Sequence, residues 1–410
     1  MIQQRLGVFL IPALAVAVLI FLFTPSQPVA QNVGGVGQTP SVFVGNGVQM
    51  PKRHGEVIQQ FPSKGPMQTA WKVHWREQSG PGLIIQDAFF KKSPNEPWMQ
   101  ILGEARLSEA FVPYHRGSPR FWDVSYNFPL CQVTQADAGP HGLLLSSAPN
   151  KNPTVVLELK DQGVAWKDSA GVRRGEQIVL WGTLSAANYR YIIEYTFRDD
   201  GLIRFKVGAT GHNYSGSEYE PHMHNHYWRI DVNLDGPENN TVQLCRHQEP
   251  RKGGKDSQAT TLHEPFNGGK EGFADFKAEE FTMVNIQHTK RKNARGQPIS
   301  YDLVPYRMGN SRHYGSETEK CTHHDYYVTR NRPKELYFKK IHDYLNGEDI
   351  SDGDVVVWYS APGHHEPRSE DGEMIKNGNG RTFSGVTPVM WCTFELKPRD
   401  LWDRSPFFKK

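Results

Sequence analysis

The feature that most constrains the fold is a series of short segments rich in β-branched and aromatic residues, separated by turn signals. Residues 189–197 and 202–207 are two such segments, and Asp199-Asp200-Gly201 lies between them. An Asp-Gly pair between two β-rich runs is a strong signal for an antiparallel hairpin. The 38 glycines and 28 prolines exceed the average share, which agrees with many turns.

Other segments extend the same pattern. Residues 227–234 are expected to form a strand, and the apolar run 355–359 is typical of a fully buried one. Helical signals are few: residues 108–111 are expected to form a short helical turn, and residues 334–345 a longer helix. The predicted fold class is therefore mainly all-β, one large antiparallel β sandwich with few short helices, over residues 66–410.

The N-terminal region is expected to lie outside this sandwich. Arg5 precedes an uncharged apolar run over residues 7–23, near the lower limit of the length that spans a membrane. We interpret residues 1–30 as a signal peptide or an N-terminal membrane anchor, whose cleavage stays open. Residues 31–65, rich in Gly, Pro, Gln and Ser, are expected to be a flexible tether. The chain should then be exported, to the periplasm or the extracellular space, with a possible membrane tether through residues 7–23.

The composition excludes two classes of protein and points to a third. The chain has 47 Lys and Arg against 44 Asp and Glu, a net charge of +3, so it lacks the basic excess of a nucleic-acid binder. None of the four cysteines forms a Cys-x-x-Cys pair, which argues against a zinc ribbon or a thioredoxin-like centre. The 17 histidines, several of them grouped, make metal binding the first chemistry to consider.

The histidine groups can be tested against strand geometry. His222, His224 and His226 share one face of a strand, but four residues of strand span about 13 Å, so at most two neighbours can bind one ion. A third ligand is expected from His364 or His365. Three imidazoles suit copper or zinc, with iron or nickel also open. Ordinary hydrogen-bonded histidines are the alternative, and that structural role is favoured for His323-His324.

Several motifs resemble those of the copper amine oxidases. Residues 185–191, Ser-Ala-Ala-Asn-Tyr-Arg-Tyr, resemble the family's Thr-x-x-Asn-Tyr-Asp/Glu-Tyr signature. His222-Met-His224 and residues 363–371 look like the family's copper-ligand segments. The motifs around Tyr114, Phe121-Trp122-Asp123, His323-His324 and Pro398 follow the family's order, so the resemblance extends over residues 66–410.

The resemblance implies a role for each matching residue. Tyr189 would be the precursor of topaquinone, a quinone made from the tyrosine by copper and oxygen. Asp123 would be the catalytic base, Tyr114 would hydrogen-bond the quinone, and Asn188 would flank it. The copper ligands would be His222, His224 and His365. Copper and topaquinone would then support the oxidative deamination of a small primary amine by O2, which yields an aldehyde, ammonia and hydrogen peroxide.

The resemblance further implies a second metal site and a homodimer. The second metal would be calcium, because carboxylates and backbone carbonyls are ligands for a hard cation. Its ligands would be Asp231, the Val232 carbonyl, Asn233, which stands where the family often has Asp, and Asp354.

Departures from the family leave two other functions open. Arg190 replaces the acidic residue that usually follows the modified tyrosine, and Ser185 replaces Thr. The family's disulfide is expected to be absent, because Cys131 has no partner in residues 153–160. One alternative is a secreted, non-catalytic copper-binding protein in which Tyr189 stays unmodified. The other is a copper/quinone oxidase that acts on a bulkier or peptidyl substrate.

Overall fold

The computed structural model describes residues 48–114, 119–169, 171–248, 260–307, 317–376, 382–383 and 385–407. The expected signal peptide or anchor, and the first part of the expected tether, lie outside these residues. Among the described residues, no helix has both the length and the apolar character needed to cross a membrane.

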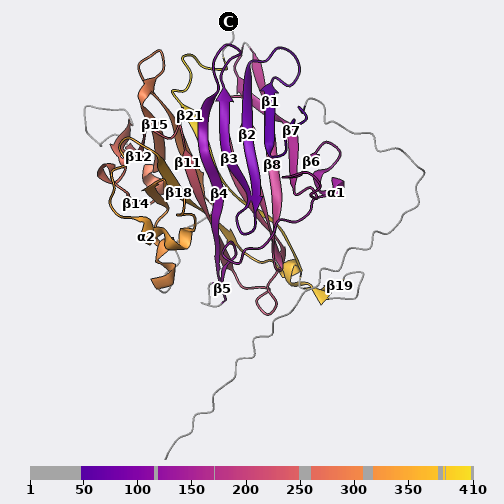
Figure 1. Cartoon of the computed structure of the whole chain (residues 1–410). Coiled ribbons are helices and arrows are strands. Elements are labelled where there is room, and N and C mark those ends of the chain that lie inside the picture. Colours follow the sequence, from indigo (N-terminus) through magenta and orange to yellow (C-terminus); the bar gives the residue numbers. More distant parts are fainter. Residues whose placement is uncertain are drawn as a thin grey trace, which may run out of the picture. The chain divides into compact units, whose positions relative to one another are not determined.

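Two large antiparallel sheets make up the folded unit (Figure 1). The first has the strand order β1-β2-β3-β4-β11-β18-β17-β14, and β5 pairs with the end of β4. Its strands are β1 Glu56–Phe61, β2 Thr69–Gln78, β3 Gly82–Lys91, β4 Met99–Pro113, β5 Arg120–Trp122, β11 His222–Val232, β14 Gly272–Ala274, β17 Tyr326–Arg330 and β18 Val355–His365.

The second sheet has the strand order β13-β12-β15-β16-β21-β10-β9-β8-β7-β6. Its strands are β6 Leu143–Leu145, β7 Val155–Lys167, β8 Val172–Ala186, β9 Tyr189–Arg198, β10 Ile203–His212, β12 Asn240–Gln248, β13 Thr260–Pro265, β15 Met283–Lys292, β16 Pro298–Tyr306 and β21 Val386–Arg399. A separate pair consists of β19 Ile375–Lys376 and β20 Thr382–Phe383.

The described helices are all short. They are α1 Gln135–Ala138, η1 Phe266–Gly269, η2 Ala278–Glu280, η3 Glu317–His323, η4 Phe338–Lys340, α2 Ile341–Tyr344 and η5 Ser369–Gly372.

The two sheets pack face to face through apolar and aromatic side chains. Trp228 of the first sheet lies with its ring centre 5.6 Å from that of Tyr195 and 5.5 Å from that of Phe205, both of the second sheet. The Tyr195 hydroxyl donates a hydrogen bond across the interface to the Ala105 carbonyl at 3.0 Å. Because two large antiparallel sheets pack face to face, and β9 and β10 bury alternate residues over most of their length, the prediction of a large antiparallel β sandwich is confirmed.

Strand β11 is buried along its whole length, on both faces. Its even-numbered residues, such as Trp228, face the second sheet, as the ring contacts above show. Its odd-numbered residues face the other way: the ring of Tyr227 stacks on that of Phe338 in η4, with centres 3.9 Å apart. The strand therefore offers two separate buried environments, one on each face.

The structure confirms some local predictions and corrects others. β9 and β10 form the predicted hairpin around Asp199-Asp200-Gly201. The expected helical turn at residues 108–111 is wrong, because these residues belong to β4 and pair with β11. The expected helix over residues 334–345 is reduced to η4 and α2. All four cysteines are free, as expected.

The expected tether over residues 31–65 is also too long. Residues 56–61 form β1, which pairs residue by residue with β2, and the side chains of Val57 and Phe61 are 1% exposed. Burial of alternate residues against the core stabilises this edge strand, although the segment around it is rich in Gly and Pro. The folded part therefore begins before residue 66.

Candidate metal centre and active-site pocket

Three buried histidines meet where β11 and β18 pair. His222 lies opposite His365 in the antiparallel register, and His224, two residues further along β11, shares the face of His222. One ring nitrogen from each of these three residues lies within 4.8 Å of the others. We call this group the histidine cluster. Spacing allowed two neighbouring histidines of this strand, and the family resemblance selected His222 and His224 together with His365; the histidine cluster contains these three, and His226 lies outside it.

Three ring nitrogens of the histidine cluster are available for a metal. Both ring nitrogens of His224 and Nε2 of His365 are buried and have no hydrogen-bond partner among the described residues. Burial lowers the pKa of His224 and of His365, so both imidazoles are neutral at physiological pH, which is the form that binds metal. His222 is oriented by a hydrogen bond of 2.8 Å between Nδ1 and the Glu220 carbonyl. A buried set of imidazoles without thiolate suits copper or zinc.

Tyr189 reaches this cluster from the second sheet. It is the first residue of β9, directly after the two-residue turn Ala187-Asn188 that joins β8 to β9. Its hydroxyl lies 3.3 Å from Nε2 of His222 and 3.2 Å from Nδ1 of His365. Burial raises the pKa of Tyr189, so without a metal its phenol is protonated at neutral pH. A cation at the histidine cluster would favour the phenolate.

The other predicted residues surround Tyr189 in different ways. The Tyr114 ring stacks on that of His222, with centres 4.2 Å apart and 16° between the planes. Asn188 donates a hydrogen bond from Nδ2 to the His212 carbonyl at 2.7 Å, which fixes the turn before Tyr189.

Arg190, the departure from the family signature, is on the other face of β9. Tyr189 and Tyr191 are buried, whereas Arg190 between them is only partly buried. Its guanidinium donates to the backbone carbonyls of Ala187 and Tyr189, each at 2.8 Å. Its positive charge is therefore bound to the turn and does not enter the pocket that Tyr189 lines.

Asp123 follows β5 and points toward the second sheet. Its backbone N–H donates to the Ala110 carbonyl at 2.9 Å, and its carboxylate accepts a hydrogen bond from the Tyr191 hydroxyl. Burial raises the pKa of Asp123 to about 7, and the nearby charge of Glu109 adds to the rise, while the Tyr191 hydrogen bond opposes it. A carboxyl group that titrates near neutrality is suited to general base chemistry.

Two residues beside Asp123, Tyr191 and Glu109, were not predicted to act at the site. Tyr191 is fully buried and holds the carboxylate; its place two residues after Tyr189, on the same strand face, could have indicated it. Glu109 is also fully buried and accepts hydrogen bonds from the N–H groups of Ala110 and Val124, at 3.0 and 2.9 Å. It braces the segment after β5. Nothing in the sequence pattern marks this contact.

A cavity of about 190 Å³ joins Asp123 to Tyr189. We call it the aromatic pocket. Its lining residues are Val112, Tyr114, Phe121, Asp123, Tyr126, Phe128, Ala186, Ala187, Asn188, Tyr189, Tyr191 and Tyr214. All four residues predicted to act in catalysis therefore line one cavity beside the histidine cluster.

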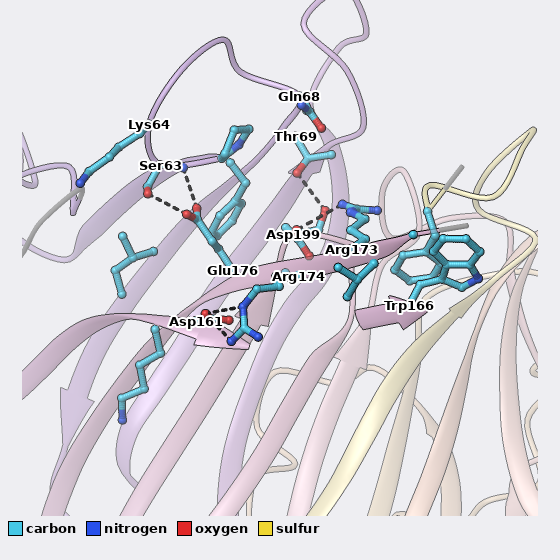
Figure 2. Close-up of a pocket in the computed structure, with 18 residues that line it drawn as sticks. Ser63, Lys64, Gln68, Thr69, Asp161, Trp166, Arg173, Arg174, Glu176 and Asp199 are labelled. Carbon is cyan, nitrogen blue, oxygen red and sulfur yellow. Dashed lines mark hydrogen bonds and ion pairs between the residues drawn. The ribbon is translucent and has the colours of Figure 1, made fainter. Parts of the chain in front are cut away.

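A larger cavity, of about 730 Å³, lies elsewhere, between the β1–β2 loop and the β7–β8 hairpin. Several of its charged groups have partners, as Figure 2 shows: Arg174 pairs with Asp161, and Glu176 accepts two hydrogen bonds from Ser63. None of the predicted site residues lines it. Size alone would select this cavity, but the residues predicted to act in catalysis line the smaller one.

A cluster of oxygen atoms lies at the other end of β11. Asp231 and Asp354 both accept hydrogen bonds from Nδ2 of Asn331, each at 3.0 Å. One oxygen of each carboxylate, and the side-chain oxygen of Asn233, are buried without a hydrogen-bond partner among the described residues. Burial, with the charge of Asp354, raises the pKa of Asp231 to about 8. We call Asp231, Asn233 and Asp354 the acid cluster; Val232 lies between two of its members.

The remaining histidine pair has a structural environment, as expected. Nδ1 of His324 lies 3.0 Å from an oxygen of Asp275, and its ring stacks on that of Phe273, with centres 3.7 Å apart. His323 ends the short helix η3. Neither belongs to the histidine cluster.

Comparison with known proteins gives the same assignment as the geometry. Residues 150–409 match the family model described as the copper amine oxidase enzyme domain. A primary amine oxidase of Klebsiella aerogenes is 23% identical over 82% of this chain and 52% of its own length. A histamine oxidase of Arthrobacter globiformis is 26% identical over 75% of this chain and 51% of its own. The chain thus spans about half the length of these relatives.

Solved structures support the fold. A copper-containing benzylamine oxidase of Hansenula polymorpha superposes with a TM-score of 0.62 at 20% identity, over 93% of this chain and 65% of that one. An Aspergillus nidulans amine oxidase gives 0.65 at 17% identity, over 92% and 56%. The family model covers more than half of the 410 residues, and the chain belongs to the copper amine oxidase family.

Proposed function

We propose that this protein oxidises small primary amines to aldehydes with O2, releasing ammonia and hydrogen peroxide, and that it uses copper and a topaquinone derived from Tyr189. One observation carries the proposal. The Tyr189 hydroxyl lies within 3.3 Å of two members of the histidine cluster, and the same side chain lines a cavity with Asp123. A tyrosine destined for modification needs contact with the metal, and a catalytic quinone needs a base within reach.

The residues present fit both groups. His222, His224 and His365 would hold copper, because one ring nitrogen of each lies within 4.8 Å of the others, and both ring nitrogens of His224 and Nε2 of His365 are buried without a hydrogen-bond partner among the described residues. When bound, copper would activate oxygen and topaquinone would accept two electrons from the amine.

The chain itself would bind the amine and move its protons. Asp123 as a carboxylate would take the proton from the carbon that bears the amino group, and its pKa of about 7 keeps much of it ionised at neutral pH. The Tyr191 hydroxyl would hold that carboxylate in place. Tyr114, stacked on His222, and Asn188, bonded within the turn, would fix the position of the modified side chain.

We propose calcium for the acid cluster. Two carboxylates and an amide oxygen, each with a buried unpartnered atom, are hard donors that a divalent cation would satisfy, and the Val232 carbonyl could complete the set. We further propose export, with residues 1–30 as signal or anchor and residues 7–23 as a membrane tether if they are retained, and a homodimer as in the family.

The test is to purify the full chain with copper in air and to measure peroxide release from primary amines together with reactivity toward phenylhydrazine. We expect peroxide release and a shifted absorption band. A colourless protein that binds copper tightly would support the alternative in which Tyr189 stays unmodified. Turnover of lysine-containing peptides in preference to free amines would support a peptidyl substrate.

A further inference from the structure

Most of the side chains that line the aromatic pocket are aromatic or small and apolar. Seven of its twelve residues carry aromatic rings, and three others are Val or Ala. Asp123 is the only charged residue among the described residues that line it. One end of a bound molecule can therefore meet a carboxylate, and the rest of it meets rings and methyl groups.

Several of the rings that line the aromatic pocket pack against one another. The ring of Phe121 lies edge-on to that of Tyr214, with centres 5.3 Å apart, and 6.2 Å from that of Tyr114. On the other side Tyr126 packs near Phe128, with centres 5.8 Å apart. Tyr126 is 55% exposed and Tyr214 37%, so these two border the opening. Their arrangement favours a flat or compact apolar group between them.

The size of the pocket limits what can fit. Its volume is about 190 Å³, and an apolar cavity of about 150 Å³ is enough to hold benzene. A single ring with a short chain would fill it, whereas a larger group would have to project through the opening.

The charge of the lining residues also distinguishes amines with one ammonium group from amines with two. The ammonium group of an incoming amine can pair with the Asp123 carboxylate. A second ammonium group at the far end would lose water and find no second carboxylate among the described lining residues. Aromatic faces attract cations only modestly, and they would not replace the lost hydration.

We infer that the substrate of this site is a monoamine that carries one aromatic or similarly compact apolar group, and that diamines are poor substrates. This inference rests on the proposed function, since it names the amine class for the same pocket.

The decisive comparison uses amines of matched size on the copper-loaded full chain. Pentylamine and putrescine have the same number of non-hydrogen atoms and differ in one terminal group. We expect kcat/KM for pentylamine to exceed that for putrescine by at least about tenfold, and phenethylamine to exceed both. Equal turnover of pentylamine and putrescine, or a preference for putrescine, would overturn the inference while leaving the proposed function intact.

A variant tests whether the missing carboxylate is the cause. Phe121→Glu adds a carboxylate to the lining of the aromatic pocket. We expect it to raise the ratio of kcat/KM for putrescine to kcat/KM for pentylamine by about tenfold or more. Phe121→Leu should leave the ratio low, and Val164→Glu, at a β7 position that is 56% exposed and outside the pocket, should not change it. An unchanged ratio in a folded Phe121→Glu protein contradicts the inference. If that variant does not fold, the wild-type ratio decides.

A binding measurement separates this inference from the proposed function. Titration calorimetry on the Tyr189→Phe chain measures amine binding where no quinone can form. We expect phenethylamine to bind more tightly than putrescine. Absent peroxide release from the copper-loaded wild-type chain, with this binding order intact in Tyr189→Phe, would refute the proposed function alone, and the reverse binding order would refute the substrate class.

Discussion

The two ends of β11 hold two buried polar groups of opposite chemistry. At the start of the strand the histidine cluster lies on the face toward the second sheet, where Tyr189 reaches it. At the other end the acid cluster uses Asp231, an odd-numbered residue on the opposite face. The first offers imidazole nitrogens, and the second offers the amide oxygen of Asn233 and the oxygens of two carboxylates, Asp231 and Asp354, whose charges repel each other.

The difference lies in what each cluster lacks. In the histidine cluster both ring nitrogens of His224 and Nε2 of His365 are buried without a hydrogen-bond partner among the described residues, and burial keeps the His224 imidazole neutral by lowering its pKa. The acid cluster already receives two hydrogen bonds from Asn331, but its carboxylates cannot both ionise cheaply. One end therefore suits a metal used in chemistry, and the other a cation used for stability.

The largest expected effect is on copper. His365→Ala should weaken copper binding by more than about 100-fold and abolish colour, because it removes one of three ligands. Competition with a chelator measures the affinity. His364→Ala, which changes the neighbour outside the histidine cluster, should retain copper, as should Asp354→Ala at the other end of the strand. Equal losses in His364→Ala and His365→Ala would refute the ligand assignment.

A smaller effect, on kcat/KM, is expected from a change at the proposed catalytic base, Asp123. Asp123→Asn should lower kcat/KM by about 10²–10⁴-fold while copper and colour remain. In the wild type, kcat/KM should rise with pH and level off above about 7, because Asp123 must be ionised to act as a base. Turnover that survives in Asp123→Asn would show that another group takes the proton.

The acid cluster is expected to affect the stability of the fold and not the turnover of amines. The pKa of Asp231 is raised from 3.8 to about 8 in the folded state, so ionisation of this carboxyl group destabilises the fold. The stabilising contribution of the protonated group is fully present below about pH 4 and is lost as the pH rises through about 8. With a metal chelator present, we expect the melting temperature to fall by a few degrees between about pH 4 and pH 8, as Asp231 ionises.

Added calcium should reverse that loss at pH 8, since it binds the folded state with both carboxylates ionised. Asp231→Asn should remove both the pH dependence and the calcium effect, and Asp161→Asn, at an exposed carboxylate, should change neither. A wild-type melting temperature insensitive to calcium would argue against a cation at this end.

The smallest effect should come from Tyr191→Phe. Its hydroxyl donates to Asp123 and so favours the ionised carboxylate. Removing the hydroxyl should move the acidic limb of the pH profile toward higher pH, with copper binding unchanged and activity well above that limb close to wild type. A uniform loss at every pH would instead indicate a general structural role.

The sequence predicts the parts of the site that local periodicity controls. Alternation along a strand brings His222 and His224 to one face and leaves His226 too far from His222. It does not decide between His364 and His365, because that choice depends on the register between β11 and β18. Family motifs selected His365, and the structure places it in the histidine cluster.

Contacts between distant segments were not predictable. The bond between Tyr191 and Asp123 joins two sheets across 68 positions of sequence. Asn331 reaches the acid cluster from the segment after β17, with no pattern to mark it. Residues 108–111 read locally as a helical turn, but pairing with β11 makes them strand, as tertiary context often overrides local propensity.

The most direct test is the mass of the peptide that contains Tyr189, measured after the metal-free chain is exposed to copper in air. We expect conversion of Tyr189 to the quinone, and no conversion when copper or air is withheld or in His365→Ala. An unmodified Tyr189 in a chain that has bound copper would contradict it.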